Sequence, residues 1–127
     1  MGRSTAELEL RVDAATEASV FRDALAALAE LLCDGAGRES VVFDVAISAA
    51  DRATLLARWL DELVFRTETE DLVPDRVERL ALDGSGLQAT VQAHRGRPRH
   101  LVQGVTYHRL SFDEVDAGYR ATVVLDV

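Results

Sequence analysis

Apolar and polar residues alternate at the start of the chain and then recur at helical spacing. Leu8, Leu10 and Val12 fall on one side of the first segment and charged residues on the other, which is the period of a half-buried strand. Thr16 is a suitable N-cap, and after it apolar residues recur every three or four positions as far as the Asp-Gly pair at 34–35. The chain is therefore predicted to begin with a strand followed by a helix.

The same order repeats in the middle of the chain. Residues 41–47 alternate as a second strand, and Ser48 and Asp51 have the spacing of a capping box that would begin a second helix. The apolar stripe of this helix is formed by Leu56, Trp59, Leu60 and Leu63. Both Trp59 and Phe65 are predicted to pack in the core.

Pro74 closes the connection after the second helix, and beyond it the apolar period changes to two. The residues in phase are Leu80 and Leu82 before a turn at 83–86, Leu87, Ala89, Val91 and Ala93 after it, Val105 and Tyr107, and then Tyr119, Ala121, Val123, Leu125 and Val127. Tyr107 is therefore predicted to face the core. Residues 1–127 are expected to form a single α+β domain of order β-α-β-α-β-β-β-β, in which two helices pack on a mainly antiparallel sheet.

The composition is that of a globular chain outside the membrane. Hydrophobic residues make up 48% and charged residues 28%, too apolar a mixture for intrinsic disorder. No apolar run approaches the roughly 18 residues that cross a bilayer, and no signal-peptide pattern opens the chain. A cytoplasmic location with no membrane partner is expected. Cys33, in the apolar stretch ALAELLCDG, is predicted to be a buried thiol at a helix end.

The charged residues exclude several function classes. All 14 basic residues are arginine, so Schiff-base catalysis, a P-loop lysine and a covalent lysine-nucleotide intermediate are impossible. The net charge of -8 opposes stand-alone nucleic-acid binding, which depends on clustered cations. The chain also lacks a nucleophile elbow, a zinc-binding His-x-x-x-His pattern and a glycine-rich phosphate loop. A non-catalytic role is therefore expected, and no catalytic residue is assigned.

The strand phase predicts that two carboxylates meet. Glu7 begins the first strand and Asp126 ends the last, and both face away from the core. If these strands are antiparallel neighbours, both carboxylates lie on one face beside the C-terminal carboxylate of Val127. Three hard oxygen donors suit Ca²⁺, Mg²⁺ or Mn²⁺ better than zinc. The alternative is a pair of solvated strand ends.

Two further groups of polar residues are candidates for supporting roles. Thr106 and His108 fall on the strand face that carries the two carboxylates, where they either support the site or are simply solvated. The run HRGRPRH places Arg95, Arg97 and Arg99 around Gly and Pro residues that force a loop. These arginines either form a solvated loop or contact RNA phosphate or an acidic partner surface.

Three separated segments carry family motifs. DRATLLARWLDELVFRTETEDLVP, at 51–74, has a Leu-Leu-x-x-Trp-Leu-x-Glu-Leu core that leads through a Thr-Glu pair to a Leu-x-Pro exit. GVTYHRL lies at 104–110 and VVLDV at 123–127. They resemble the second helix, the Ala-Val-Thr-Tyr-His-Gly-Leu strand and the Val-Leu-Asp-hydrophobic ending of archease, the small accessory protein of tRNA splicing.

The resemblance implies a metal-binding α+β protein that activates a GTP-dependent tRNA-splicing RNA ligase by promoting its guanylylation and turnover. The family's metal site, in which calcium is the ion expected here, combines the aspartate of a His-Thr-Ala-Asp motif with the C-terminal aspartate. On this chain the first motif falls on Ser4-Thr5-Ala6-Glu7 and the second on Asp126.

Three positions depart from the family pattern. Ser4 stands in place of histidine, Glu7 in place of aspartate, and Gln103 about where a lysine precedes the Val-Thr-Tyr-His strand. Glutamate keeps the charge but lengthens the arm by a methylene, and serine does not titrate near neutrality. The alternative function is therefore a divergent archease-like scaffold that binds a protein partner without metal-dependent activation.

Overall fold

The computed structural model describes residues 6–33, 39–99 and 102–127, and its element order is the predicted one. The elements are β1 (Glu7–Ala14), α1 (Glu17–Leu32), β2 (Ser40–Ser48), α2 (Arg52–Glu70), β3 (Leu72–Leu82), β4 (Gly86–Arg95), β5 (Gly104–Val115) and β6 (Gly118–Asp126). The α+β class and the order β-α-β-α-β-β-β-β are confirmed.

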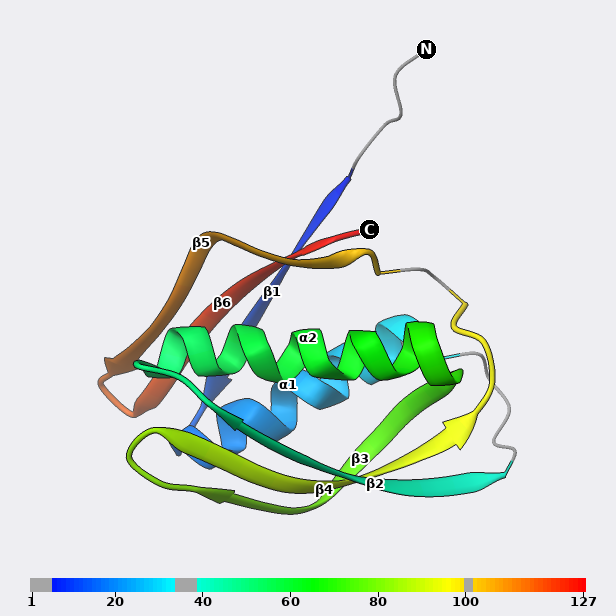
Figure 1. The fold of residues 1–127 in the computed structure, drawn as a ribbon. Coiled ribbons are helices and arrows are strands. Elements are labelled where there is room, and N and C mark those ends of the chain that lie inside the picture. The colour runs from blue at the N-terminus through cyan, green and yellow to red at the C-terminus, as the bar shows by residue number, and fades with distance from the viewer. Residues whose placement is uncertain (1–5, 34–38, 100–101) are drawn as a thin grey trace.

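The strands form two antiparallel sheets instead of the single sheet that was expected. One sheet has the order β1-β6-β5 and the other β2-β4-β3, and every pairing is antiparallel. Helices α1 and α2 lie between the two sheets (Figure 1), and each helix contacts strands of both. The two helices therefore supply a shared apolar layer for both sheets.

The core is centred on the contact between the two helices. Phe21 of α1 and Trp59 of α2 are fully buried, and the Trp59 Nε1–H donates a hydrogen bond to the Phe21 carbonyl oxygen at 2.9 Å. Phe112 of β5 packs on Phe21 with ring centroids 5.8 Å apart, and Tyr119 of β6 continues the contact at 6.0 Å. This chain of rings joins the helices to the β1-β6-β5 sheet.

The start of α2 differs from the prediction. Asp51, not Ser48, is the N-cap, and its carboxylate accepts a hydrogen bond from the Thr54 N–H at 2.8 Å. Ser48 is still part of β2, where it pairs with Gly86 of β4. The predicted capping box is wrong because strand pairing continues through the first of its two residues.

The end of α2 also differs from the prediction. Asp71 takes the left-handed conformation (φ 53°) directly after the helix, and β3 begins at Leu72. Pro74 therefore lies inside β3 and does not close the connection. β3 is an edge strand of its sheet, a position that tolerates a residue without an N–H donor.

Three side chains that were predicted to be buried are exposed. Phe65 is 54% exposed, because it follows Leu63 by two positions and so points about 200° around the helix from the buried stripe. Cys33 is exposed because it is the C-cap, beyond the last buried position of α1. Tyr107 is 56% exposed because β5 loses its regular register with β6 between Thr106 and Ser111.

The Asp51 cap makes a testable contribution to acid stability. The Thr54 backbone N–H, and next the Thr54 side chain, lower the pKa of the Asp51 carboxyl from its usual 3.8. A lowered folded-state pKa gives stability that is present above pH 3.8 and is lost as the pH falls through the folded-state value. Asp51→Ala should therefore lower the urea midpoint at pH 7, and the difference from wild type should narrow at pH 3.

Asp51→Asn is the matched control for this experiment, since it keeps an oxygen acceptor at the N-cap without a titrating group. Its midpoint at pH 7 should stay above that of Asp51→Ala. Equal midpoints for wild type and Asp51→Ala at pH 7 would contradict the assigned cap.

Candidate functional site at the β1-β6 strand ends

The register of β1 and β6 places Glu7 directly opposite Asp126. Cross-strand partners present their side chains on the same face, so the predicted meeting of the two strand ends is confirmed. On the other side of Asp126 the partner residue is Gly104 of β5. A Cβ placed on Gly104 would meet nothing within 4 Å, so Asp126 is open on that side.

Backbone hydrogen bonds hold the last residues in place on both sides. The Val127 N–H donates to the Ala6 carbonyl oxygen at 3.0 Å, and the Gln103 N–H donates to the Asp126 carbonyl oxygen at 2.7 Å. Val127 is therefore fixed beside the start of β1, next to the Glu7-Asp126 pair. Ser4, which was predicted to support the site, lies outside the described residues.

Arg109 of β5 contacts this acidic face, and the sequence reasoning missed it. Its guanidinium nitrogens lie 3.7 Å from Glu7 Oε1 and 3.7 Å from Glu9 Oε2. Its backbone is left-handed, with φ 59°. The GVTYHRL motif contained the signal that could have identified it, because the similar family strand has glycine where this chain has Arg109.

The two other predicted supporting residues, Thr106 and His108, lie near Arg109 on β5. Thr106 is half-buried, pairs with Val124 of β6, and its hydroxyl accepts a hydrogen bond from the His108 N–H at 3.1 Å. The His108 side chain is exposed in the stretch where β5 loses its regular register. A supporting role for these two residues stays a prediction.

The arginine-rich loop is anchored by the backbone to the ends of both helices. The Gly96 N–H donates to the Asp71 carbonyl oxygen at 2.9 Å, and the Arg99 N–H donates to that of Leu32 at 3.1 Å. Arg97 lines a cavity of about 370 Å³ between the helix ends. Arg95 pairs with Glu39 at 3.4 Å. Within the described ranges no ion pair joins these arginines to Glu7 or Asp126, and a phosphate or partner contact stays a prediction.

The residues as arranged are a poor fit for the expected divalent ion. Carboxylates of Glu7 and Asp126 are hard donors of the type that Ca²⁺ prefers. Yet the Arg109 guanidinium already contacts Glu7, and the described part of the chain contains no group of three or more His, Cys, Asp or Glu residues placed to hold a metal ion.

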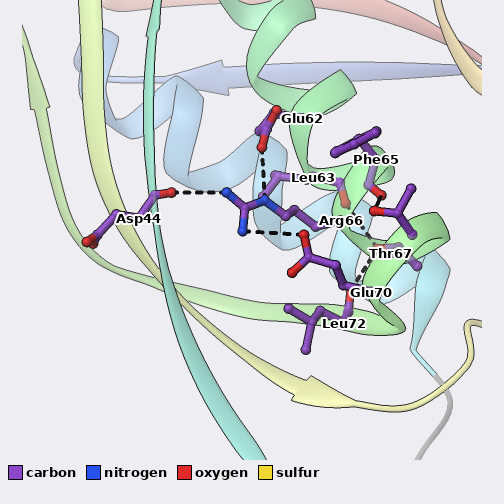
Figure 2. A network of polar contacts seen from close by, with 9 residues as sticks. Asp44, Glu62, Leu63, Phe65, Arg66, Thr67, Glu70 and Leu72 are labelled. Carbon is purple, nitrogen blue, oxygen red and sulfur yellow. Dashed lines mark hydrogen bonds and ion pairs between the residues drawn. The ribbon is translucent and has the colours of Figure 1, made fainter.

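A second polar network, around Arg66 of α2, has a structural role (Figure 2). Its guanidinium lies 2.9 Å from Glu62 Oε2 and 3.6 Å from Glu70 Oε2, and 3.5 Å from the Asp44 carbonyl oxygen of β2. It also covers the Phe43 ring, 4.7 Å from the centroid. These contacts fasten α2 to β2 and partly neutralise the acidic end of the helix.

In the described residues, fold and site define a class of small α+β proteins. Two helices lie between two three-stranded antiparallel sheets, and acidic residues lie at the paired ends of the first and last strands. Neither helix among the described residues has the length and apolarity that crossing a bilayer requires. The model of the Archease protein family (MTH1598/TM1083) matches residues 2–127, and the chain belongs to this family.

Individual relatives agree with the family match. The protein archease of Methanothermobacter thermautotrophicus is 30% identical over 117 residues, which cover 85% of this chain and 83% of that protein. The protein archease of Archaeoglobus fulgidus is 29% identical over 130 residues, which cover 97% of this chain and 94% of that protein.

Solved structures share the fold. The solution structure of Methanobacterium thermoautotrophicum protein 1598 has a TM-score of 0.66 at 27% identity, covering 100% of this chain and 95% of that one. The crystal structure of an archease, described as a possible chaperone, from Thermotoga maritima has a TM-score of 0.69 at 16% identity. It covers 98% of this chain and 91% of that one, and shows the fold alone.

Proposed function

We propose that this archease activates a GTP-dependent RNA ligase in the cytoplasm, in tRNA splicing or RNA repair, and does not catalyse ligation itself. The proposal assigns the contact with the ligase to the sheet face that carries Glu7 and Asp126. The observation that carries it is the β1-β6 register, which pairs the two acidic positions marked by the family resemblance. The activity promoted would be guanylylation of the ligase and its turnover.

The charge of the chain supports an accessory role. With a net charge of -8, it is repelled by RNA phosphates, so the ligase must hold the RNA. A ligase that binds RNA and GTP presents cationic surface, and carboxylates on an exposed sheet face are complementary to such a surface. Because Asp126 is open on the Gly104 side, a cationic group of the ligase can reach it there.

Asp126→Ala should remove most of the activation. We expect stimulation of the cognate ligase to fall about ten-fold or more, the effect of losing about 1.4 kcal/mol of interaction with the partner. The measurement is the rate of ligase guanylylation with labelled GTP, together with multiple-turnover RNA joining. The fold should be unaffected, because a surface substitution away from the core usually changes stability by within about 0.5 kcal/mol.

Asp13→Ala is the matched control, since Asp13 lies on the same pair of strands, opposite Arg120 instead of Asp126. Its stimulation should equal that of wild type. Full stimulation by Asp126→Ala would overturn the assignment of the site. If wild-type protein binds the ligase without accelerating either reaction, the alternative holds, and the protein is a scaffold without activator function.

A further inference from the structure

We infer that Arg109 is a built-in counter-ion of the Glu7 face and takes the place that a divalent cation would occupy there. The inference rests on the site of the proposed function but not on the ligase. The cation that balances the charge of these carboxylates is then a guanidinium group of the protein's own β5 strand, which contacts Glu7 and Glu9.

The ion pairs of Arg109 join the two outer strands of the sheet. β5 and β1 lie on opposite sides of β6, yet the guanidinium of Arg109 on β5 reaches carboxylates on β1. The two ion pairs therefore span β6, and the residues of β6 opposite Glu7 and Glu9 are Asp126 and Val124. The guanidinium thus contacts Glu7, one of the two carboxylates that a divalent ion at this site would need.

The burial of Val124 fits this crossing. Val123 and Leu125 belong to the core cluster, so Val124 between them lies on the opposite face of the sheet, with Glu9 as its partner on β1. Val124 is nevertheless 0% exposed. The ion pair between Glu9 and Arg109 spans β6 here, and the aliphatic parts of long charged side chains can cover an apolar residue while their charged ends stay in water.

The backbone of Arg109 is in a conformation that is unfavourable for arginine. At φ 59° the Cβ of an L-residue crowds its own backbone, whereas glycine adopts this conformation freely. The family strand that this segment resembles has glycine at the same place. Residues held in such conformations cluster at functional sites, and here the side chain in this conformation is the one that contacts two carboxylates.

Repulsion by the positive charge of Arg109 should lower the affinity of this face for divalent ions. A divalent ion at Glu7 and Asp126 would lie beside the positive charge of Arg109 and would compete with it for Glu7. Since Arg109 and Glu7 side chains are 54% and 47% exposed, the ion pair is partly screened by water. The outcome is weak divalent binding by wild type that strengthens when the guanidinium is removed.

Isothermal titration calorimetry with Mn²⁺ and the full-length protein, in the absence of the ligase, tests this inference. Arg109→Gly should bind Mn²⁺ about ten-fold more tightly than wild type or better, because one repelling charge is lost. Adding Asp126→Ala to Arg109→Gly should abolish the gain. Arg120→Ala is the matched control: it removes an arginine that pairs with Asp13 at 2.6 Å on the same strands, and should bind like wild type. Equal Mn²⁺ affinity of wild type and Arg109→Gly would overturn the inference.

Thermal melting of a third variant separates backbone strain from charge. Arg109→Ala also lacks the guanidinium but keeps a Cβ in the left-handed conformation, so it should melt at a lower temperature than Arg109→Gly. A higher melting temperature for Arg109→Ala would overturn the conformational part of the argument. Neither measurement involves the ligase, so failure of the proposed activator function would leave both results intact.

Discussion

Replacing Trp59 with alanine is expected to lower the free energy of unfolding by about 5 kcal/mol, the largest effect of any single substitution considered. Trp59 is 0% exposed between the two sheets, so its removal leaves a large cavity. It also leaves the buried Phe21 carbonyl oxygen without the indole N–H that donates to it at 2.9 Å. Because domains are stable by only about 5–15 kcal/mol, the variant should be partly unfolded at room temperature.

Guanidinium chloride denaturation followed by far-ultraviolet circular dichroism measures this effect, since the variant has no tryptophan fluorescence. Trp59→Phe is the control: it retains an aromatic ring but loses the hydrogen bond, and should be destabilised by about 2 kcal/mol. A Trp59→Ala variant within about 1 kcal/mol of wild type would contradict the helix-to-helix packing described for the core.

Gly118→Ala is expected to lower the free energy of unfolding by about 3 kcal/mol. Gly118 begins β6 after the turn from β5 and has φ 153°, a conformation that side chains rarely adopt. A Cβ there would overlap the carbonyl oxygen of Ala14 and lie 2.9 Å from the Ala15 Cα. These neighbours are backbone atoms where β1 passes into α1, so the clash cannot be relieved by moving a side chain.

Gly84→Ala provides the comparison for this substitution. A Cβ on Gly84, in the turn between β3 and β4, would meet nothing within 4 Å. Its free energy of unfolding, measured by urea denaturation, should stay within about 0.5 kcal/mol of that of wild type. Equal destabilisation by the two alanine variants would mean that loss of glycine, and not the contact with Ala14, is responsible.

The helices could be predicted from the sequence because their signals are local. Thr16 caps α1 as expected, with its side chain accepting a hydrogen bond from the Ser19 N–H. Leu56, Leu60 and Leu63 are all fully buried, since the helical period alone determines which residues share a face. The predicted capping box is wrong because the sequence allows Ser48 to belong to a strand or to a helix start. Only its pairing with Gly86 shows that it belongs to β2.

The division into two sheets could not be predicted in the same way. Alternation in β2 or β6 shows which side of a strand is buried, but carries no information on which strand lies beside it. Both sheets face the helices, so the strands of each show the same apolar period as those of a single sheet. Partner choice is a tertiary property that local patterns do not encode.

The candidate site was predictable as far as regular pairing extends. Glu7 and Asp126 came from the period of two, which β1 and β6 keep from end to end. Tyr107 and Arg109 lie where β5 loses that register, so extrapolating the phase beyond Thr106 assigned Tyr107 to the wrong face and gave Arg109 no role. The contact of Arg109 with β1 depends on the three-dimensional arrangement of the strands, which the sequence pattern does not give.

The left-handed backbone at Arg109 also has a consequence at the level of the genetic code. Every arginine codon becomes a glycine codon by a single base change, and glycine is the residue best suited to φ 59°. Since the Arg109 side chain lies on the surface, exchange between the two leaves the core untouched. A single base change therefore suffices to remove the positive charge from this face or to restore it.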